Sequence, residues 1–474
     1  MKTKILLVIT FIIILKFYPS HGSKQIDEVD ILGFSENILL SIHDSPYTHH
    51  VEPTLAISED DVIFVGWKNA FSHNGPGVRV SFSKSTNNGK SWSKPFDMPM
   101  YKGINTGQSD PWLVWHDEIL YYAYLEYSIY TEELSQITLT KSTNQGETWN
   151  NPVAASNGEL FADKETMTVS SDGIVYVVYD DVDFDTHFAT VRITRSTNGG
   201  DSFDEVGVIA DSTTHPEDHV GPYVITDSNN HVYVAWAWFL DGIWGDVYLV
   251  VSQDQGETFS KEIDVNPLSK NVTYETTPDQ NPSRTTLPII RFDQNDRLYV
   301  LWADKHYVNA GWDIFIRYSD DYGLNWSERF QVNPDRVGNQ WQPDMDIDSK
   351  GHCHIVWYDE HKDTYGPYYR TIKFPERNSQ EEITFGEPLP IASENTSSTF
   401  TRPGDYFMVK VDSKDIPHVV WSDGREDEMD IYYSHGLTEE PSSSNPTSIN
   451  LLTILVPITM IGLYTRRQNR TRRK

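Results

Sequence analysis

Short apolar runs separated by polar turns extend along most of the chain. They hold four to seven residues, are rich in Val, Ile, Tyr and Trp, and are bounded by Asp, Asn, Gly and Ser, as in VIFVGW, IVYVVY, HVYVAW and RLYVLW. Runs of this length and composition are typical of β-strands, and no long amphipathic helical pattern accompanies them. The sequence therefore predicts an all-β protein built from many short strands.

The strands recur in a fixed order. In each unit, a strand that ends in an aliphatic-aromatic pair is preceded by another short strand and followed by a third strand, a turn and a fourth strand. The aromatic residues that end these strands recur every 55 to 66 residues, at Trp67, Tyr124, Tyr179, Trp236, Trp302, Trp357 and Trp421. Four antiparallel strands per unit, repeated at a nearly constant period, are typical of the blades of a β-propeller.

Both ends of the repeat region indicate how the ring closes. Residues 36–436 hold seven units, but the seventh stops after its third strand, MDIYYSHG. The region begins with a single strand, ENILLSIHD, that matches the fourth strand of the other units. This N-terminal strand is expected to complete the last blade, since ring closure removes exposed sheet edges. The predicted fold is a seven-bladed β-propeller of four-stranded antiparallel blades.

The turn after the third strand carries a recurrent motif in five of the seven units. It reads STNNGKSW, STNQGETW, STNGGDSF, SQDQGETF and SDDYGLNW, starting at Ser85, Ser142, Ser196, Ser252 and Ser319. In such a turn the Asp or Asn side chain accepts backbone N–H groups, and Gly supplies a positive φ. The motif resembles the Asp box, or BNR repeat, of the sialidase (neuraminidase) superfamily. This resemblance implies a fold rather than an activity, because Asp boxes also occur in propellers that hydrolyse nothing.

The strand order places the candidate chemistry on one face. First strands start, and second strands end, on the face opposite the Asp boxes, so we expect the ligand to bind there. The candidate ligand-binding residues at these positions are Glu52, Asp163, Asp405, Trp341, Arg284, Arg402 and Arg425. The primary hypothesis is a cell-surface, sialidase-like propeller whose partner is a glycan or a cell-surface protein.

The family resemblance also implies an alternative, an exo-sialidase-type retaining glycosidase for terminal sialic or related acidic sugars. Such an enzyme uses an arginine cluster for the substrate carboxylate, a Tyr nucleophile activated by Glu, and an Asp acid/base. The candidates are Arg284, Arg402 and Arg425 for the cluster, Tyr406 for the nucleophile, Glu165 or Glu52 for its partner, and Asp110 or Asp163 for the acid. However, the family opens its first blade with Arg-Ile-Pro, whereas this chain has Val51-Glu52-Pro53.

The net charge of the chain argues against some classes of binding partner. The net charge is −31, and all 69 acidic residues but only 29 of the 38 basic residues lie within residues 23–448, which therefore carry −40. Such a domain should repel nucleic acid and anionic membrane surfaces. The acidic rim is also compatible with a calcium ion, which takes six to eight oxygen ligands, and no other cofactor is expected. The single cysteine, Cys353, cannot form an intramolecular disulfide, so the core must supply the stability.

The N-terminal residues 1–22 resemble a secretory signal peptide. Lys2 and Lys4 precede an apolar run over residues 5–15, and small residues lead to a cleavage position after Gly22. Export from the cell is therefore expected.

The C-terminal region is expected to anchor the protein. A polar stalk over residues 437–448 leads to an apolar segment over residues 449–465 and a basic tail over residues 466–474. By the positive-inside rule, this order predicts a single transmembrane helix with a cytoplasmic C-terminus and the propeller on the extracellular face of the membrane. Membrane contact is expected through this segment only. A sorting tail that is cleaved and replaced by another anchor is the alternative.

Overall fold

The computed structural model describes residues 30–439, apart from segments within this range. The segments left out are 42–46, 72–76, 102–105, 129–134, 157–159, 184, 187, 211–218, 241–242, 268–286, 305–310, 336, 378, 398–402 and 427. The expected signal peptide, the apolar segment, the basic tail and nearly all of the stalk lie outside the described residues. Within the part of the chain that is described, no helix is long and apolar enough to cross a membrane.

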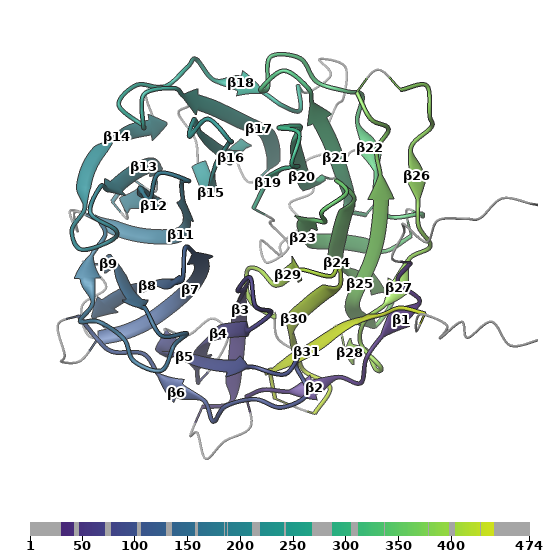
Figure 1. Cartoon of the computed structure of the whole chain (residues 1–474), viewed down its shortest axis with the longest axis horizontal. Coiled ribbons are helices and arrows are strands. Elements are labelled where there is room, and N and C mark those ends of the chain that lie inside the picture. The colour runs from purple at the N-terminus through teal and green to yellow at the C-terminus, as the bar shows by residue number, and fades with distance from the viewer. Residues whose placement is uncertain are drawn as a thin grey trace, which may run out of the picture. The chain divides into compact units, whose positions relative to one another are not determined.

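The described residues within 1–438 form seven antiparallel sheets around a central axis (Figure 1). Blade 1 consists of β3 (His49–Ile57), β4 (Ile63–Ala70), β5 (Gly77–Ser85) and β6 (Phe96–Asp97). Blade 2 consists of β7 (Thr106–His116), β8 (Ile119–Ser128), β9 (Ser135–Ser142) and β10 (Val153–Ala154). Blade 3 consists of β11 (Phe161–Val169), β12 (Val175–Asp183), β13 (Phe188–Ser196) and β14 (Asp204–Ala210).

The next three blades follow the same order. Blade 4 consists of β15 (His219–Thr226), β16 (Val232–Leu240), β17 (Ile243–Ser252) and β18 (Ile263–Asp264). Blade 5 consists of β19 (Ile289–Phe292), β20 (Leu298–Asp304), β21 (Asp313–Ser319) and β22 (Phe330–Gln331). Blade 6 consists of β23 (Asn339–Ile347), β24 (Cys353–His361), β25 (Thr364–Lys373) and three short pieces that pair with β25, namely β26 (Thr384–Phe385), β27 (Leu389–Pro390) and β28 (Thr396–Ser397).

Blade 7 is completed from the other end of the repeat region, as predicted. It contains β29 (Met408–Val411), β30 (Pro417–Asp423) and β31 (Asp430–Leu437). The N-terminal strands β1 (Gly33–Phe34) and β2 (Ile38–Leu39) both pair antiparallel with β31, which Figure 1 shows as purple strands beside a yellow one. The seven-bladed fold and its closure by the N-terminal strand are therefore confirmed.

The five Asp boxes fold in the same way. In the first box, the Ser85 hydroxyl accepts a hydrogen bond from the amide of Gly89 at 2.9 Å, and Asn87 Oδ1 accepts one from the amide of Ser91 at 2.9 Å. The bond from glycine to serine recurs in the boxes that start at Ser142, Ser196, Ser252 and Ser319. The boxes thus satisfy their own backbone groups, which explains why the motif appears wherever this turn is needed.

Each Asp box also packs on the blade before it. The ammonium group of Lys84 in blade 1 donates to the carbonyl of Gln145 in the second box at 2.8 Å, and Lys141 and Arg195 make the equivalent contact with the third and fourth boxes. A Cβ added to Gly146 would lie 2.5 Å from the Phe82 ring. The small size of this glycine therefore lets neighbouring blades approach each other.

The core lies between the blades. The aromatic residues that end the second strands are buried, and Trp67, Trp236, Trp302, Trp357 and Trp421 are among the largest fully buried side chains. The indole N–H of Trp421 donates to Asp423 Oδ2 at 3.0 Å, and that of Trp357 donates to Asp359 Oδ2 at 3.3 Å. These two acids at second-strand ends are therefore part of the packing of their own blade.

We expect Gly146→Ala to destabilise the protein by about 3 kcal/mol, because it combines a φ of 78° with a clash against Phe82. Gly173→Ala is the matched control. It has a φ of 82° but nothing within 4 Å of the added Cβ, so it should cost only about 1 kcal/mol. Urea unfolding measures both, and equal losses would contradict the role of blade contact.

Candidate functional site

The first strands share a distortion near their starts. Within the described ranges, the pairing register shifts in β3, β7, β11, β15 and β23, and one residue at each shift has a positive φ. These residues are Glu52 (55°), Asp110 (50°), Lys164 (53°), Gly221 (67°) and Gln342 (48°). A β-bulge of this kind leaves a residue outside the ladder and changes the direction of its side chain. Proline follows four of the five, and proline suits a bulge because it has no N–H to donate.

These bulges bring side chains of distant blades together. Lys164 of blade 3 forms an ion pair with Asp405, which directly precedes blade 7. The Tyr406 hydroxyl donates to the carbonyl of Pro111 in blade 2 at 3.0 Å. Contacts between blades that are not neighbours in the ring must cross its centre. We therefore name as the axial cluster the residues Glu52, Lys68, Asp110, Asp163, Lys164, Glu165, Asp405 and Tyr406.

The acids Glu52 and Asp110 differ in protonation. Glu52 is 1% exposed, and burial together with the charge of Asp110 raises its pKa to about 7, although Lys68 lies 3.2 Å from Glu52 Oε2. Burial also acts to raise the pKa of Asp110, but Lys164 and Lys68 outweigh it and hold this pKa below its ordinary value. The two carboxyl groups lie close enough that each affects the other's pKa. Just below pH 7, Glu52 is thus mainly a neutral carboxylic acid, whereas Asp110 is a carboxylate.

Glu165 is the acid of the axial cluster with the fewest hydrogen bonds to the described residues. It is 2% exposed, and in the described part of the chain neither carboxyl oxygen has a hydrogen-bond partner. Burial, with the charge of Asp110, raises its pKa well above the ordinary value. Burial likewise raises the pKa of Asp163, against the effect of Lys164. The two carboxyl oxygens of Glu165 are thus hydrogen-bonding atoms for which the described residues supply no partner.

Tyr406 lies beside these acids, but its environment opposes ionisation. Burial and the charges of Asp110 and Glu52 raise the pKa of its hydroxyl well above the ordinary value. The hydroxyl proton is directed at the Pro111 carbonyl rather than at a carboxylate. In this state Tyr406 is a neutral hydrogen-bonding group and not an activated nucleophile.

The arginine cluster expected from the family resemblance does not form around Arg425. Its guanidinium group donates to Asn37 Oδ1 at 3.1 Å and to Ser393 Oγ at 3.0 Å, pairs with Asp423, and lies over the Tyr432 ring. These partners belong to the outer part of blade 7 and its neighbour, so Arg425 is part of the scaffold. The other two members, Arg284 and Arg402, lie outside the described residues.

Trp341 also differs from the expectation. It is 4% exposed, and its ring stacks on Tyr358 at 4.6 Å and contacts Tyr365 at 5.4 Å, so it is a core residue. The next residue, Gln342, has the positive φ of the bulge and donates from its amide to the Gly404 carbonyl at 2.5 Å. Of these two neighbours, Trp341 packs within its own blade, whereas Gln342 contacts the segment before blade 7.

Two further residues of the site, Lys68 and Gln342, were not among the expected site residues. Lys68 faces Glu52 across the strand pair, because Lys68 pairs with Val51 in the register of β3 and β4. The position directly before the first-strand proline is the sequence signal that would have identified Glu52, Asp110 and Gln342 together. Among the described residues, no group of three or more His, Cys, Asp or Glu side chains is placed to hold a metal ion, so the calcium hypothesis gains no support there.

Comparison with known proteins supports the fold. No protein-family model matches the sequence, and no curated protein is found to match it. A protein of unknown function from Dyadobacter fermentans DSM 18053 has a TM-score of 0.50 at 14% identity, over 71% of this chain and 96% of that chain. The described residues therefore define a seven-bladed Asp-box propeller with the sialidase-type fold.

Two glycosidases also resemble the chain. The GH93 α-L-arabinofuranosidase of Fusarium graminearum, in complex with arabinobiose, gives a TM-score of 0.46 at 11% identity, over 85% of this chain and 97% of that chain. The NanB sialidase (K499G mutant) of Streptococcus pneumoniae gives 0.45 at 13% identity, over 84% and 70%. At these identities the likeness concerns the fold alone.

Protonation of Glu52 should make stability depend on pH. Because its pKa of about 7 in the folded protein lies above the ordinary 4.5, unfolding releases a proton between these values, and stability falls as the pH rises through this window. At pH 8, Glu52→Gln should therefore be more stable than the wild type by about 2–3 kcal/mol, with little difference near pH 4.5. Urea unfolding at several pH values measures this. The exposed control Glu381→Gln should follow the wild type, and a parallel curve for Glu52→Gln would contradict the assignment.

Proposed function

We propose that the protein is a glycan-binding propeller that holds a terminal sugar at the axial cluster. The observation that carries this proposal is the convergence of acids and lysines from distant blades, where the described residues leave both carboxyl oxygens of Glu165 without a hydrogen-bond partner. A buried polar group without a partner costs free energy, and a ligand that supplies the missing hydrogen bonds recovers it. Sugar hydroxyls both donate and accept, so they suit this mixture of carboxyl and ammonium groups.

The charge of the axial cluster selects among sugars. Five carboxyl groups face two lysines, and one lysine, Lys164, is already paired with Asp405. Among the described residues no positive charge exceeds these acids, because Arg425 is committed to blade 7, so an anionic sugar gains no net attraction from them. Neutral sugars and sugars that carry an amino group therefore fit the cluster better than sialic acid. We also propose that an anchor at residues 449–465 displays this site outside the cell.

Glycoside hydrolysis is the second candidate. The neutral Glu52 beside the ionised Asp110 has the division of protonation that an acid/base pair needs. However, the two acids of a glycosidase flank the scissile bond and act on it directly, whereas Glu52 is already paired with Lys68 at 3.2 Å and Asp110 already accepts from the Ser109 hydroxyl. We therefore propose glycan binding, rather than glycoside hydrolysis, as the primary function.

A glycan array tests the binding proposal. Arrays with neutral, amino-bearing and sialylated glycans should show binding to the first two classes. Glu165→Gln and Lys164→Met should each weaken binding at least tenfold, because the first replaces a carboxyl oxygen, which can accept a hydrogen bond, with an amide nitrogen that can only donate, and the second removes an ammonium donor. Lys90→Met, which alters an exposed lysine on the Asp-box face, is the control and should bind like the wild type. Binding restricted to sialylated glycans would overturn the proposed specificity.

Hydrolysis is tested separately with 4-nitrophenyl glycosides of neutral, amino and sialic sugars. The proposal predicts no release of nitrophenol by the wild type above that of the double variant Glu52→Gln/Asp110→Asn. Turnover that this variant abolishes would establish the second candidate instead.

A further inference from the structure

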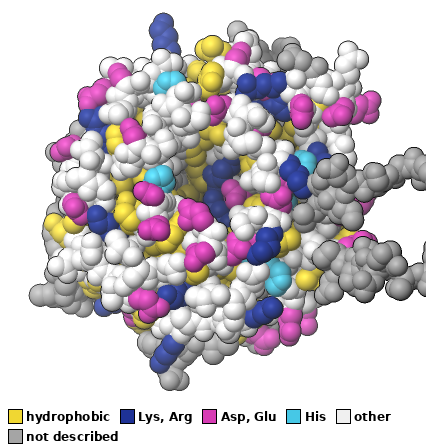
Figure 2. Space-filling view, in the orientation of Figure 1, with side chains coloured by type: hydrophobic (Ala, Val, Ile, Leu, Met, Phe, Trp, Pro, Cys, Tyr) yellow, Lys and Arg dark blue, Asp and Glu magenta, His cyan; other side chains and the backbone are white. Residues whose placement is uncertain are grey.

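The centre of the ring also holds a cavity, which we name the channel cavity. Its volume is about 280 Å³, and residues from all seven first strands line it. Figure 2 shows a hollow at the centre of the ring with hydrophobic and basic side chains on its wall. The lining residues lie toward the strand ends, on the Asp-box side, whereas the axial cluster lies at the strand starts.

Aromatic side chains separate the two sites. The Trp112 ring contacts Tyr406 at 5.8 Å and Tyr223 at 5.4 Å, both edge to face. A small space bordered by Trp112, Tyr406 and Met408 has a volume of about 10 Å³. This is room for no more than one water molecule. The channel cavity is therefore distinct from the axial cluster and does not depend on the function proposed for it.

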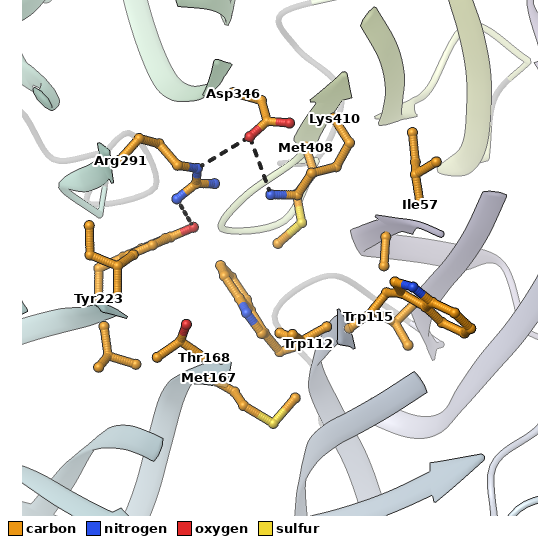
Figure 3. A pocket seen from close by; sticks show the side chains of 15 residues that line it. Ile57, Trp112, Trp115, Met167, Thr168, Tyr223, Arg291, Asp346, Met408 and Lys410 are labelled. Carbon is orange, nitrogen blue, oxygen red and sulfur yellow. Dashed lines mark hydrogen bonds and ion pairs between the residues drawn. The ribbon is translucent and has the colours of Figure 1, made fainter. Parts of the chain in front are cut away.

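Charged side chains gather on one side of the channel cavity (Figure 3). Arg291 Nε and Lys410 Nζ face the same oxygen, Asp346 Oδ1, at 3.7 and 3.8 Å. Both distances exceed those of a hydrogen bond. The other oxygen of Asp346 already accepts from the amide of Val411 at 2.9 Å. The carboxylate is thus held by β29, and it satisfies neither cation closely.

The cations have more donors than the site has acceptors. A guanidinium group carries five N–H donors and an ammonium group three. Arg291 donates to the Tyr223 hydroxyl and to the Ile290 carbonyl, and its Nη2 lies 3.5 Å from Asp344 Oδ1. Its Nε has no hydrogen-bond partner within the described residues. What the site lacks is therefore an acceptor, and specifically one that reaches both Arg291 and Lys410.

The opposite side of the cavity is apolar. Trp112 and Met167 lie across from the charged group in Figure 3, and Ile57 and Ile225 also line the cavity. A volume of 280 Å³ equals that of roughly nine water molecules in the liquid, which matches a small organic molecule. A ligand that fills this space has one acidic end and one apolar body.

We infer that the channel cavity binds a small organic carboxylate with an aromatic or branched apolar body. The carboxylate lies between Arg291 and Lys410, where Nη2 of the guanidinium group and the ammonium group each offer a donor. The apolar body packs on Trp112 and Met167.

Titration calorimetry with phenylacetate tests this inference on the full chain. Benzyl alcohol has the same ring without the charge, and acetate has the charge without the ring, so both should bind at least tenfold more weakly than phenylacetate. Arg291→Gln and Lys410→Met should each weaken phenylacetate binding at least tenfold. Lys410 is partly exposed, so its variant tests the site even if Arg291→Gln fails to fold.

Two control variants complete the experiment. Lys90→Met removes an exposed cation in the first Asp box and should leave phenylacetate binding unchanged. Glu165→Gln, in the axial cluster, should also leave it unchanged, which separates this site from the proposed glycan site. The inference is overturned if phenylacetate gives no binding, if benzyl alcohol binds as tightly, or if Lys410→Met binds like the wild type.

Discussion

Contact between neighbouring blades is the interaction on which the whole ring depends. The core clusters combine residues from the strands of adjacent sheets, so a blade alone would leave its faces open to water. The Asp boxes extend this contact to one face of the ring, where Lys84, Lys141 and Arg195 each reach the box of the following blade. Pairing of β2 with β31 closes the circle and leaves the last blade with a covered edge.

Ring closure in turn decides what lies at the axis. The first strands of all blades meet there, and their bulges direct the residue before the proline toward the centre. Burying acids at this point is costly unless they are neutralised or paired. The axial cluster uses both solutions, because Lys164 pairs with Asp405 while Glu52 and Glu165 have raised pKa values. A scaffold built by repetition thus carries one irregular, strongly polar site.

The two ends of the central channel differ in chemistry because different positions of the same strands line them. Strand starts supply mainly acids and lysines, whereas strand ends supply Arg291 and Lys410 opposite an apolar wall. Trp112 is held between Tyr406 and Tyr223 and separates the two ends. The two sites that we propose therefore differ in chemistry, and this aromatic contact lies between them.

Local patterns in the sequence determined the class of fold, the number of blades, the position of ring closure and the geometry of the Asp boxes. Each of these depends on hydrophobic periodicity and turn chemistry within one repeat, which the residues themselves display. Only the tertiary structure decided which side chains reach the axis. A bulge moves the register by one residue, so Gln342 rather than Trp341 faces the centre, and the scaffold around blade 7 holds Arg425 away from it. Side-chain direction depends on such shifts and on contacts between blades that are far apart in the sequence, and no pattern within a single repeat encodes them.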